Sequence, residues 1–308
     1  MSDSIIIGVD HGYAAMKTAH FAFPSGLVAY EYEPYTLSNV LEYGGKFYVV
    51  GSGRQPLQKD KTQTEDYYLL TLAAIAKELE YRNAGTVADV HLAAGLPLTS
   101  FGRDKKAFRD YLCRDGKPVS FQFEGQDYAI TISKVSLYPQ GYAAVLTQSG
   151  LLNEPSVIVA DIGGWTVDLM RLDNRIPNAA TCRSLELGMI RCLDEISEQI
   201  RRSLDLSMTA AQIESVLRSD TSHVNEDAKK IIHLEAERYT KRLLSAIAES
   251  GLDVRAMPAV FLGGGAALLK RHVSAADGLC RPVILDDISL NAKGYEWLTE
   301  RLEQKYEQ

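Results

Sequence analysis

Cysteine is scarce in this chain, and its few cysteines lack the spacing of a metal site or a disulfide framework. Four occur among 308 residues, with no C-x-x-C pair and no histidine nearby at metal-ligand spacing. We therefore expect free thiols in a reducing compartment. The four residues are Cys113, Cys182, Cys192 and Cys280.

Long hydrophobic runs and an excess of positive charge are also absent. No window approaches the roughly 20 apolar residues that a membrane-spanning helix needs, and the N-terminal MSDSIIIGVD lacks the basic lead-in of a signal peptide. The 40 acidic and 33 basic residues give a formal charge of −7, which argues against a protein whose main work is coating nucleic acid. We expect a cytoplasmic protein without membrane contact.

The sequence is rich enough in apolar residues for two α/β domains of ordinary size. Hydrophobic residues make up 46% of the 308 positions, and strand patterns alternate with helical ones. A third strand of the second half is expected at 180–185, a helix at 141–148 and a domain junction at Ser149–Gly150. Strands are predicted at 5–10, 88–98, 156–161 and 166–172, and helices at 66–82 (amphipathic), 102–113, 189–204, 209–218 and 226–249.

Both halves open with a β-hairpin whose first strand ends in Asp-x-Gly. The two copies are Asp10-His11-Gly12 and Asp161-Ile162-Gly163, and their separation of ~150 residues is about one domain length. This weak internal duplication predicts two related domains that face each other, with a ligand cleft between them.

The first hairpin, GVDHGYAAMK, has the composition of a phosphate-binding turn. Gly12 lets backbone N–H groups approach a phosphate without a Cβ in the way, and Lys17 adds a compact positive charge for the outer phosphates. Asp10 stands at the strand end. Taken alone, D-x-G-x4-K is also a common accident of ordinary turns.

The second hairpin, DIGGWTVDLM, repeats these features. Gly163 and Gly164 can cradle phosphate, Thr166 offers a hydroxyl, and Asp161 places a hard oxygen ligand where a Mg²⁺-nucleotide needs one. Asp168 has two interpretations, a water-orienting residue or an ordinary exposed strand residue.

A third glycine turn, FLGGGAALLK, lies between an apolar strand and a helix. Three glycines in succession are poorly explained by stability, because each loses extra entropy on folding. Close approach of a ligand at the positive end of a helix dipole explains Gly263, Gly264 and Gly265 better than a tight structural turn does.

Two Asp-x-Gly hairpins followed by one late strand-glycine-helix turn resemble the actin-like ATPase superfamily. Four further segments resemble its ParM/StbA-type plasmid-segregation actins. They are SLYPQGYAAVL (136–146), GLPLT (95–99), LELGMIRCLDEI (185–196) and SLNAKGYEWL (289–298). By position, the resemblance implies two phosphate loops, an adenosine loop and a helix start beside the nucleotide. The first phosphate loop comprises Asp10, Gly12, Tyr13 and Lys17, and the second comprises Asp161, Gly163, Gly164, Thr166 and Asp168. The adenosine loop comprises Gly263, Gly264 and Gly265, and the helix starts at Gly188.

The resemblance implies an actin-like, ribonuclease H-like α/β fold. One domain comprises 1–148, with a small subdomain at 21–82 and the C-terminal helix 289–308 packed back on it, and the other comprises 149–288. Asp10 and Asp161 are the implied Mg²⁺ ligands. Gln140 stands where the family positions the attacking water, which makes Gln140, Asp10 and Asp161 the expected catalytic residues. The alternative for Gln140 is a helix N-terminal residue that merely follows Pro139.

Two positions depart from the family pattern. Tyr13 and Ala14 follow Gly12 where a hydroxyl residue is usual, so that phosphate contact would have to come from backbone N–H groups. Trp165 replaces a small or hydroxyl residue between Gly164 and Thr166, and the sequence gives no role for its indole.

The implied function is an ATPase, using ATP or GTP with Mg²⁺, that polymerises with itself into filaments. In the resembling systems the filament segregates plasmid DNA through a DNA-binding adaptor of the ParR type, so no direct DNA contact is expected. Two alternatives stay open at this point: a small-molecule kinase of the same fold, and an actin-like scaffold that binds nucleotide but barely hydrolyses it.

Overall fold

Two separate hydrophobic cores divide the chain. The computed structural model describes residues 4–36, 38–53, 60–148, 150, 153–219 and 223–306. Unit 1 comprises Met1–Thr147 and Ser289–Gln308, and unit 2 comprises Gln148–Ile288. Ser149, at the expected junction, lies outside the described residues.

Unit 1 is built on a nine-stranded sheet with a parallel centre. The central strands β1, β7 and β9 run parallel, and antiparallel hairpins extend the sheet on both sides. In spatial order the strands are β3 (Ala22–Pro24), β2 (Ala15–Lys17), β1 (Ile5–His11), β7 (Val87–Leu96), β9 (Gln126–Pro139), β8 (Pro118–Phe123), β5 (Val40–Tyr43), β6 (Lys46–Val50) and β4 (Leu27–Tyr30).

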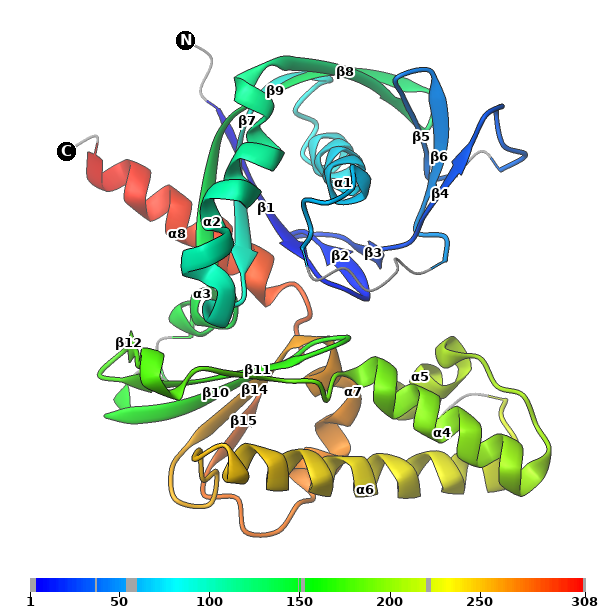
Figure 1. Ribbon diagram of the computed structural model, residues 1–308, viewed down its shortest axis with the longest axis vertical. Helices are drawn as coiled ribbons and strands as arrows, with labels where there is room; N and C mark the ends of the chain where they lie inside the picture. The colour runs from blue at the N-terminus through cyan, green and yellow to red at the C-terminus, as the bar shows by residue number, and fades with distance from the viewer. Residues whose placement is uncertain are drawn as a thin grey trace. The chain divides into compact units, whose positions relative to one another are not determined.

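Helix α1 (Asp66–Tyr81) lies inside the curve of this sheet (Figure 1). Its pattern predicts an amphipathic helix, yet most of its 16 residues are buried, including Thr71 and Glu78. The prediction of one exposed face is wrong because the strands surround the helix, and an apolar run such as LLTLAAIA suits burial on all sides.

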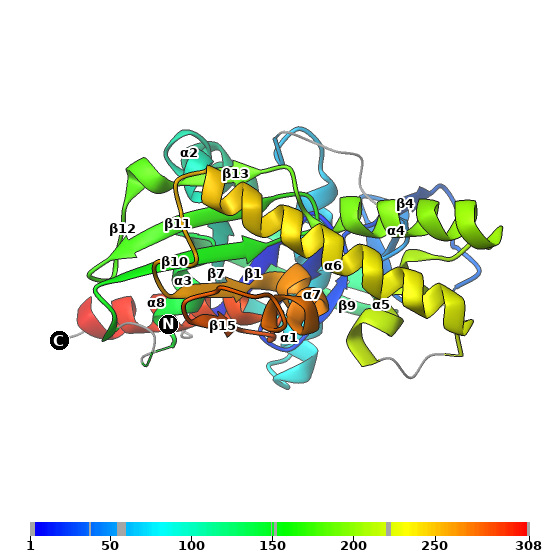
Figure 2. The ribbon, with the colours of Figure 1, turned by 90° about the horizontal axis from the view of Figure 1, so that it is seen from below.

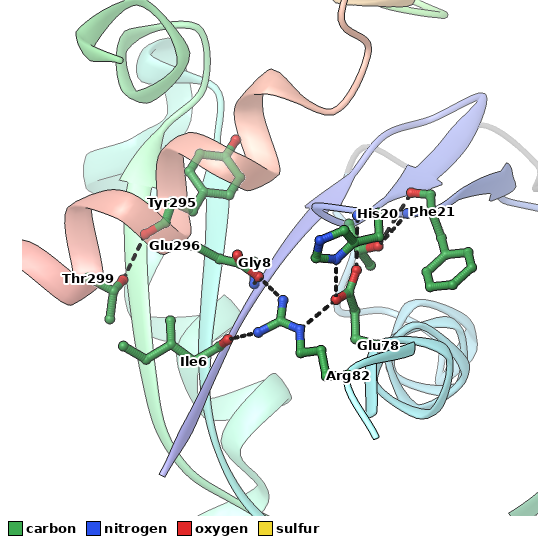
Figure 3. Close-up of polar contacts among 10 residues, drawn as sticks. Ile6, Gly8, His20, Phe21, Glu78, Arg82, Tyr295, Glu296 and Thr299 are labelled. Atoms are coloured by element: carbon green, nitrogen blue, oxygen red, sulfur yellow. Dashed lines mark hydrogen bonds and ion pairs between the residues drawn. The ribbon is translucent and has the colours of Figure 1, made fainter. Parts of the chain in front are cut away.

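The C-terminal helix α8 (Leu290–Tyr306) packs against β1 and β7, and a polar network joins it to β1 (Figure 3). Glu296 accepts hydrogen bonds from the backbone N–H of Gly8 (2.8 Å) and from Arg82 (2.6 Å). Arg82 also donates to Glu78 at 2.8 Å. The network therefore ties the last helix of the chain to its first strand and to the end of α1.

Two further helices of unit 1 follow strands of the parallel centre. Helix α2 (Leu98–Cys113) follows β7, and α3 (Tyr142–Leu146) follows β9. Helix α3 is shorter than the predicted 141–148. Gly141 has φ of +72°, outside the right-handed helical region, so the helix begins only at Tyr142.

Unit 2 has a second mixed sheet covered by helices. Figure 1 shows α4, α6 and α7 on one face, and Figure 2 shows α6 running across the strands. The strands are, in order, β12 (Ile176–Pro177), β11 (Val167–Asp173), β10 (Ser156–Ile162), β14 (Ala259–Leu262) and β15 (Pro282–Ile284), with β13 (Arg183–Leu185) beside β11. The helices are α4 (Met189–Leu204), α5 (Ala210–Ser219), α6 (Glu226–Glu249) and α7 (Gly263–Ser274).

The predicted strand at 180–185 is only partly present. The Asn178 side chain accepts a hydrogen bond from the N–H of Ala180 (3.1 Å), which closes a short 3₁₀ turn at Ala179–Thr181. This side chain competes with the β ladder for the backbone, so pairing with β11 is confined to Arg183–Leu185.

Two further predictions concern the cysteines and membrane-spanning helices. All four cysteines are free thiols. None of the helices in the described part of the chain is both long enough and apolar enough to cross a bilayer.

Candidate functional site

The predicted site residues lie where parallel strands end. In unit 1, β1 and β9 end at His11 and Pro139, and in unit 2, β10 and β14 end at Ile162 and Leu262. Ligands of open α/β sheets bind outside the carboxyl ends of such strands. Each unit therefore carries part of the predicted site at the sheet edge where ligands of such folds bind.

Asp10 is the centre of the unit 1 part. Its side chain is 5% exposed and pairs with the Lys17 ammonium at 3.1 Å. Its other oxygen accepts a hydrogen bond from the Gln140 amide nitrogen at 3.0 Å. Gln140 is fixed at the end of β9, where its backbone N–H donates to the Leu96 carbonyl (2.9 Å).

Lys61 is a second cation near this carboxylate, and no motif in the sequence pointed to it. Burial by itself raises the pKa of Asp10, but the charges of Lys17 and Lys61 outweigh burial and bring that pKa below its ordinary value. Burial lowers the pKa of the neighbouring His11 to about 3, with a further contribution from Lys61. His11 is therefore a neutral imidazole, which bonds to the Thr71 hydroxyl at 2.8 Å.

Two hydrogen bonds from Ser25 fix the first hairpin turn. The Ser25 hydroxyl donates to the Gly12 carbonyl (2.7 Å), and the Ser25 N–H donates to the Ala14 carbonyl (3.1 Å). A Cβ on Gly12 would meet the Ala15 carbonyl at 2.4 Å and the Lys17 ammonium at 2.9 Å. The close packing of the turn therefore requires glycine at position 12. Tyr13 follows Gly12 at the tip of the turn.

The second hairpin turn is held by the start of helix α4. The N–H groups of Gly188, Met189 and Ile190 donate to the carbonyls of Trp165 (2.9 Å), Gly163 (3.0 Å) and Gly164 (2.9 Å) respectively. These are orphan donors of a helix N-terminus. Because they bind the carbonyls of the turn, its peptide units are fixed in one orientation before any ligand arrives.

Gly188 makes this arrangement sterically possible. A Cβ at this position would lie 2.3 Å from the Trp165 carbonyl carbon and 2.4 Å from the Gly164 oxygen, both of them backbone atoms. Gly188, predicted as a nucleotide-side residue, therefore contacts the second turn directly.

Asp161 and Asp168 face each other across β10 and β11. They form a register pair in the antiparallel ladder, and Asp161 is buried. The Thr166 hydroxyl donates to Asp168 at 3.2 Å. Asp168 is thus a partly buried residue bonded to the turn, unlike the exposed strand residue that the sequence left as an alternative.

The triple glycine opens helix α7 next to Asp161. Gly263 has φ of +89°, and a Cβ there would lie 2.5 Å from Asp161 Oδ1. A Cβ on Gly265 would clash with Ile162 at 2.2 Å. Gly264 differs from both, since a Cβ there meets nothing within 4 Å.

The site residues fall into two groups. Asp10, Gly12, Tyr13, Lys17 and Gln140 belong to unit 1, whereas the residues predicted on the second hairpin, at Gly188 and on the triple glycine belong to unit 2. The described residues contain no group of three or more His, Cys, Asp or Glu side chains arranged to hold a metal ion. Mg²⁺ usually takes only one or two protein carboxylates together with water and phosphate oxygens, and the buried carboxylates of Asp10 and of Asp161 are each of the donor type that it prefers.

Two family models match the chain in sequence. The model of the N-terminal domain of actin like proteins matches residues 8–142. The model of the C-terminal domain of the archaeal actin homologue, MreB-like, matches residues 159–275. The chain is also 24% identical to the archaeal actin homolog of Thermoplasma volcanium, over 96% of this chain and 99% of that protein.

Solved structures show the same fold at low identity. The archaeal actin homolog Ta0583 matches with a TM-score of 0.77 at 20% identity, over 97% of this chain and 99% of that one. Its complex with ADP gives 0.74 at 20% identity, over 96% and 99%. A protein of the 15-stranded ParM filament from Clostridium botulinum gives 0.75 at 18% identity, over 97% and 99%. Because one actin-like family model matches unit 1 and another matches unit 2, this chain is a member of the actin-like superfamily.

Proposed function

We propose that this protein is an ATPase that binds ATP with Mg²⁺, assembles into filaments in the ATP-bound state and weakens the filament by hydrolysis. The observation that carries the proposal is the contact between Gln140 and Asp10. A phosphate turn needs no glutamine merely to bind nucleotide, whereas hydrolysis needs a residue that holds a water in line with the γ-phosphate.

The geometry of Gln140 suits that role. A carboxylate only accepts hydrogen bonds, so Asp10 fixes the Gln140 amide nitrogen toward itself. The amide oxygen is then the atom that can accept a hydrogen bond from an attacking water. Asp10 therefore orients Gln140, in addition to its predicted role as a Mg²⁺ ligand.

Each of the two turns is proposed to bind nucleotide phosphate. Lys17 supplies positive charge, and the turn at Gly163 and Gly164 supplies backbone N–H groups whose orientation helix α4 fixes. Asp10 and Asp161 are the residues that would hold Mg²⁺, which neutralises developing phosphate charge when bound. The ADP complex of Ta0583 supports a nucleotide ligand for this fold.

Filament formation is proposed from the likeness to a ParM filament protein. Head-to-tail contacts between identical protomers leave the assembly open, which is how one protein gives a helical filament. Segregation of plasmid DNA through a ParR-type adaptor is the finer form of the proposal, and it rests on the resemblance of segment 136–146 to plasmid-segregation actins.

Electron microscopy and light scattering of the purified protein with ATP, ADP or no nucleotide test this function. Filaments that form with ATP and shorten as phosphate is released support it. A protein that stays monomeric with ATP under crowding contradicts the filament. Phosphate release that requires a sugar, alcohol or acid would instead identify a kinase, and filaments without phosphate release would identify a scaffold.

A further inference from the structure

His91 of β7 bonds through both ring nitrogens to side chains of two other elements. Its Nδ1 lies 2.6 Å from Glu303 Oε1 on α8, and its Nε2 lies 2.8 Å from Ser136 Oγ on β9. The imidazole thus connects a serine hydroxyl to a carboxyl group. This is the arrangement in which a serine acts as a nucleophile, and it is recognised by geometry rather than by position in the sequence.

The proton of His91 lies on the side of Glu303. Burial lowers the pKa of His91 and outweighs the hydrogen bond to Glu303, which raises it, so the imidazole is neutral at about pH 7. Glu303 also forms an ion pair with Lys134 at 3.4 Å, and a carboxylate only accepts hydrogen bonds. Nδ1 therefore carries the proton, and Nε2 is the nitrogen that can take the hydroxyl proton of Ser136.

Ser136 borders a cavity of about 580 Å³ along one edge of β9. In the described part of the chain, β8 pairs with β9 only as far as Thr131, whereas β7 pairs with it as far as Pro139. Every residue from Ser133 to Tyr138 lines the cavity, although side chains of successive strand residues point to opposite faces. The cavity therefore follows the open edge of the strand, and its volume is within the range of small-molecule sites.

Backbone N–H groups face this edge on both sides of Ser136. The N–H of Gln140 donates to the Leu96 carbonyl of β7, and successive residues of a strand in a parallel sheet direct their backbone groups alternately to its two sides. Counting back from Gln140, Ser136 directs its backbone toward β7, whereas Val135 and Leu137 direct theirs toward the open edge. Two such N–H groups beside a nucleophile can form an oxyanion hole.

One part of the cavity lining is apolar. Leu302 of α8 borders the cavity and is 45% exposed, and Leu137 and Cys113 add further apolar surface. Charged side chains border the rest, among them Arg109 and Asp110 of α2. An apolar chain that covers the first group removes its surface from water, which is favourable.

We propose that Ser136 and His91, positioned by Glu303, are the nucleophile and the general base of a serine esterase in unit 1 that cleaves carboxylic esters with short apolar acyl chains. This activity goes beyond the proposed function and needs no nucleotide. Ser136 and His91 are its catalytic residues, and Glu303 is a positioning residue that holds the His91 proton on Nδ1.

The reaction has two halves. The Ser136 oxygen adds to the ester carbonyl while its proton passes to His91 Nε2, and the N–H groups of Val135 and Leu137 stabilise the oxyanion. The bond to the leaving alcohol oxygen then breaks as His91 returns the proton to that oxygen. Water hydrolyses the acyl-serine by the same route, which releases the carboxylic acid and restores the Ser136 hydroxyl.

Two measurements on the nucleotide-free full chain test the proposal. A fluorophosphonate probe, mapped by mass spectrometry, should form one adduct, on Ser136. Hydrolysis of p-nitrophenyl butyrate should fall by about 10²-fold or more in Ser136→Ala, the usual scale for loss of a catalytic group. Ser120→Ala, an exposed serine of the neighbouring strand β8, is the matched control and should hydrolyse the ester as the wild type does.

Glu303→Gln tests the positioning role without removing the hydrogen-bonding side chain. We expect its kcat to fall about tenfold or more with KM nearly unchanged, since only the transition state depends on the orientation of His91. Thermal melting separates this effect from a loss of stability, and if Ser136→Ala melts well below the wild type, Glu303→Gln carries the test.

A wild type that forms no adduct, or forms it at another residue, overturns the proposal. Ester hydrolysis retained in Ser136→Ala overturns it as well. Either result would show that Ser136, His91 and Glu303 only join α8 to the sheet, and it would leave the proposed function intact. Unchanged kcat in a Glu303→Gln variant that melts as the wild type does would overturn the role of Glu303.

Discussion

The Gln140 amide nitrogen lies 3.0 Å from Asp10 Oδ1, although 130 positions separate the two residues in the sequence. Both stand at carboxyl ends of parallel strands, on either side of β7 in the sheet. The contact leaves the second Asp10 oxygen to Lys17, and in the proposed function the amide oxygen of Gln140 receives the attacking water.

Gln140→Ala should therefore lose turnover while nucleotide binding is retained. We expect phosphate release from ATP to slow by about 10²-fold or more, the usual scale for a positioned group that acts on the reacting water. Release is measured with a phosphate-sensing assay and affinity with a fluorescent nucleotide. Gln126→Ala, at the exposed first residue of β9, is the control. Unchanged turnover in Gln140→Ala would show that Gln140 is only a residue that precedes α3.

Gly188→Ala should disrupt the second phosphate turn. The added methyl would meet backbone atoms of Gly164 and Trp165, which cannot move without breaking the hydrogen bonds from α4. We expect a loss of about 1–3 kcal/mol of stability and a larger loss of nucleotide affinity. The chain has two tryptophans, Trp165 and Trp297, so Trp297→Phe leaves Trp165 fluorescence as the reporter of this turn.

In that background, ATP should change the Trp165 emission of the parent protein and leave it unchanged in Gly188→Ala. If ATP changes the Trp165 emission of Gly188→Ala as much as that of the parent, the contacts of α4 with the turn are not needed for nucleotide binding.

Gly263 and Gly264 should respond differently to alanine. Gly263→Ala places a methyl against Asp161 in a positive-φ position, so it should destabilise unit 2 by about 1–3 kcal/mol. Gly264→Ala meets open space and should leave thermal melting nearly unchanged. If the open space receives the nucleotide, Gly264→Ala weakens its binding without unfolding the protein. Wild-type affinity in Gly264→Ala would remove Gly264 from the nucleotide site.

Acid should weaken unit 1 through Glu78. Burial raises the pKa of Glu78, but hydrogen bonds from Thr18 and His20 and the charge of Arg82 outweigh burial and place the pKa below its ordinary value of 4.5. A carboxylate with a lowered pKa stabilises the fold above about pH 4.5, and this stabilisation is lost as the pH falls through the folded-state pKa.

Glu78→Gln should accordingly cost about 2 kcal/mol at pH 7, where the charged acceptor is lost, and should flatten the fall of stability below pH 4.5. Urea unfolding between pH 3 and 7 measures both effects, with Glu80→Gln, an exposed neighbour on the same helix, as the control. An acid profile of Glu78→Gln that parallels the wild type would exclude this carboxylate as its source.

Much of the architecture was predictable because it is local. The strand at 5–10 and the helices at 189–204 and 226–249 follow from the hydrophobic period, whereas the actin-like fold was implied by the family resemblance of the glycine turns, and that fold is confirmed. The predictions failed where a tertiary or side-chain contact decided the outcome. The sheet surrounds α1 and buries its expected polar face, and the Asn178 side chain shortens the strand at 180–185.

The predicted site shows the same division. Asp10, Gly12, Asp161 and Gly163 could be predicted as site residues because the chemistry of a turn depends on neighbouring residues. The approach of Lys61 to the carbonyl of His11 could not be predicted, since only folding brings it there from the segment before α1. Ser25 was missed for the same reason.

The sequence alone determined which turns are candidates for binding phosphate, because glycine, aspartate and lysine act there over a few bonds. The tertiary structure decided how those turns are held and which cations and amides face Asp10. Helix α4 fixes the second turn, Ser25 fixes the first, and Gln140 meets Asp10 across β7. These contacts join residues far apart in the chain, and their positions depend on strand order and register, which no short stretch of sequence encodes.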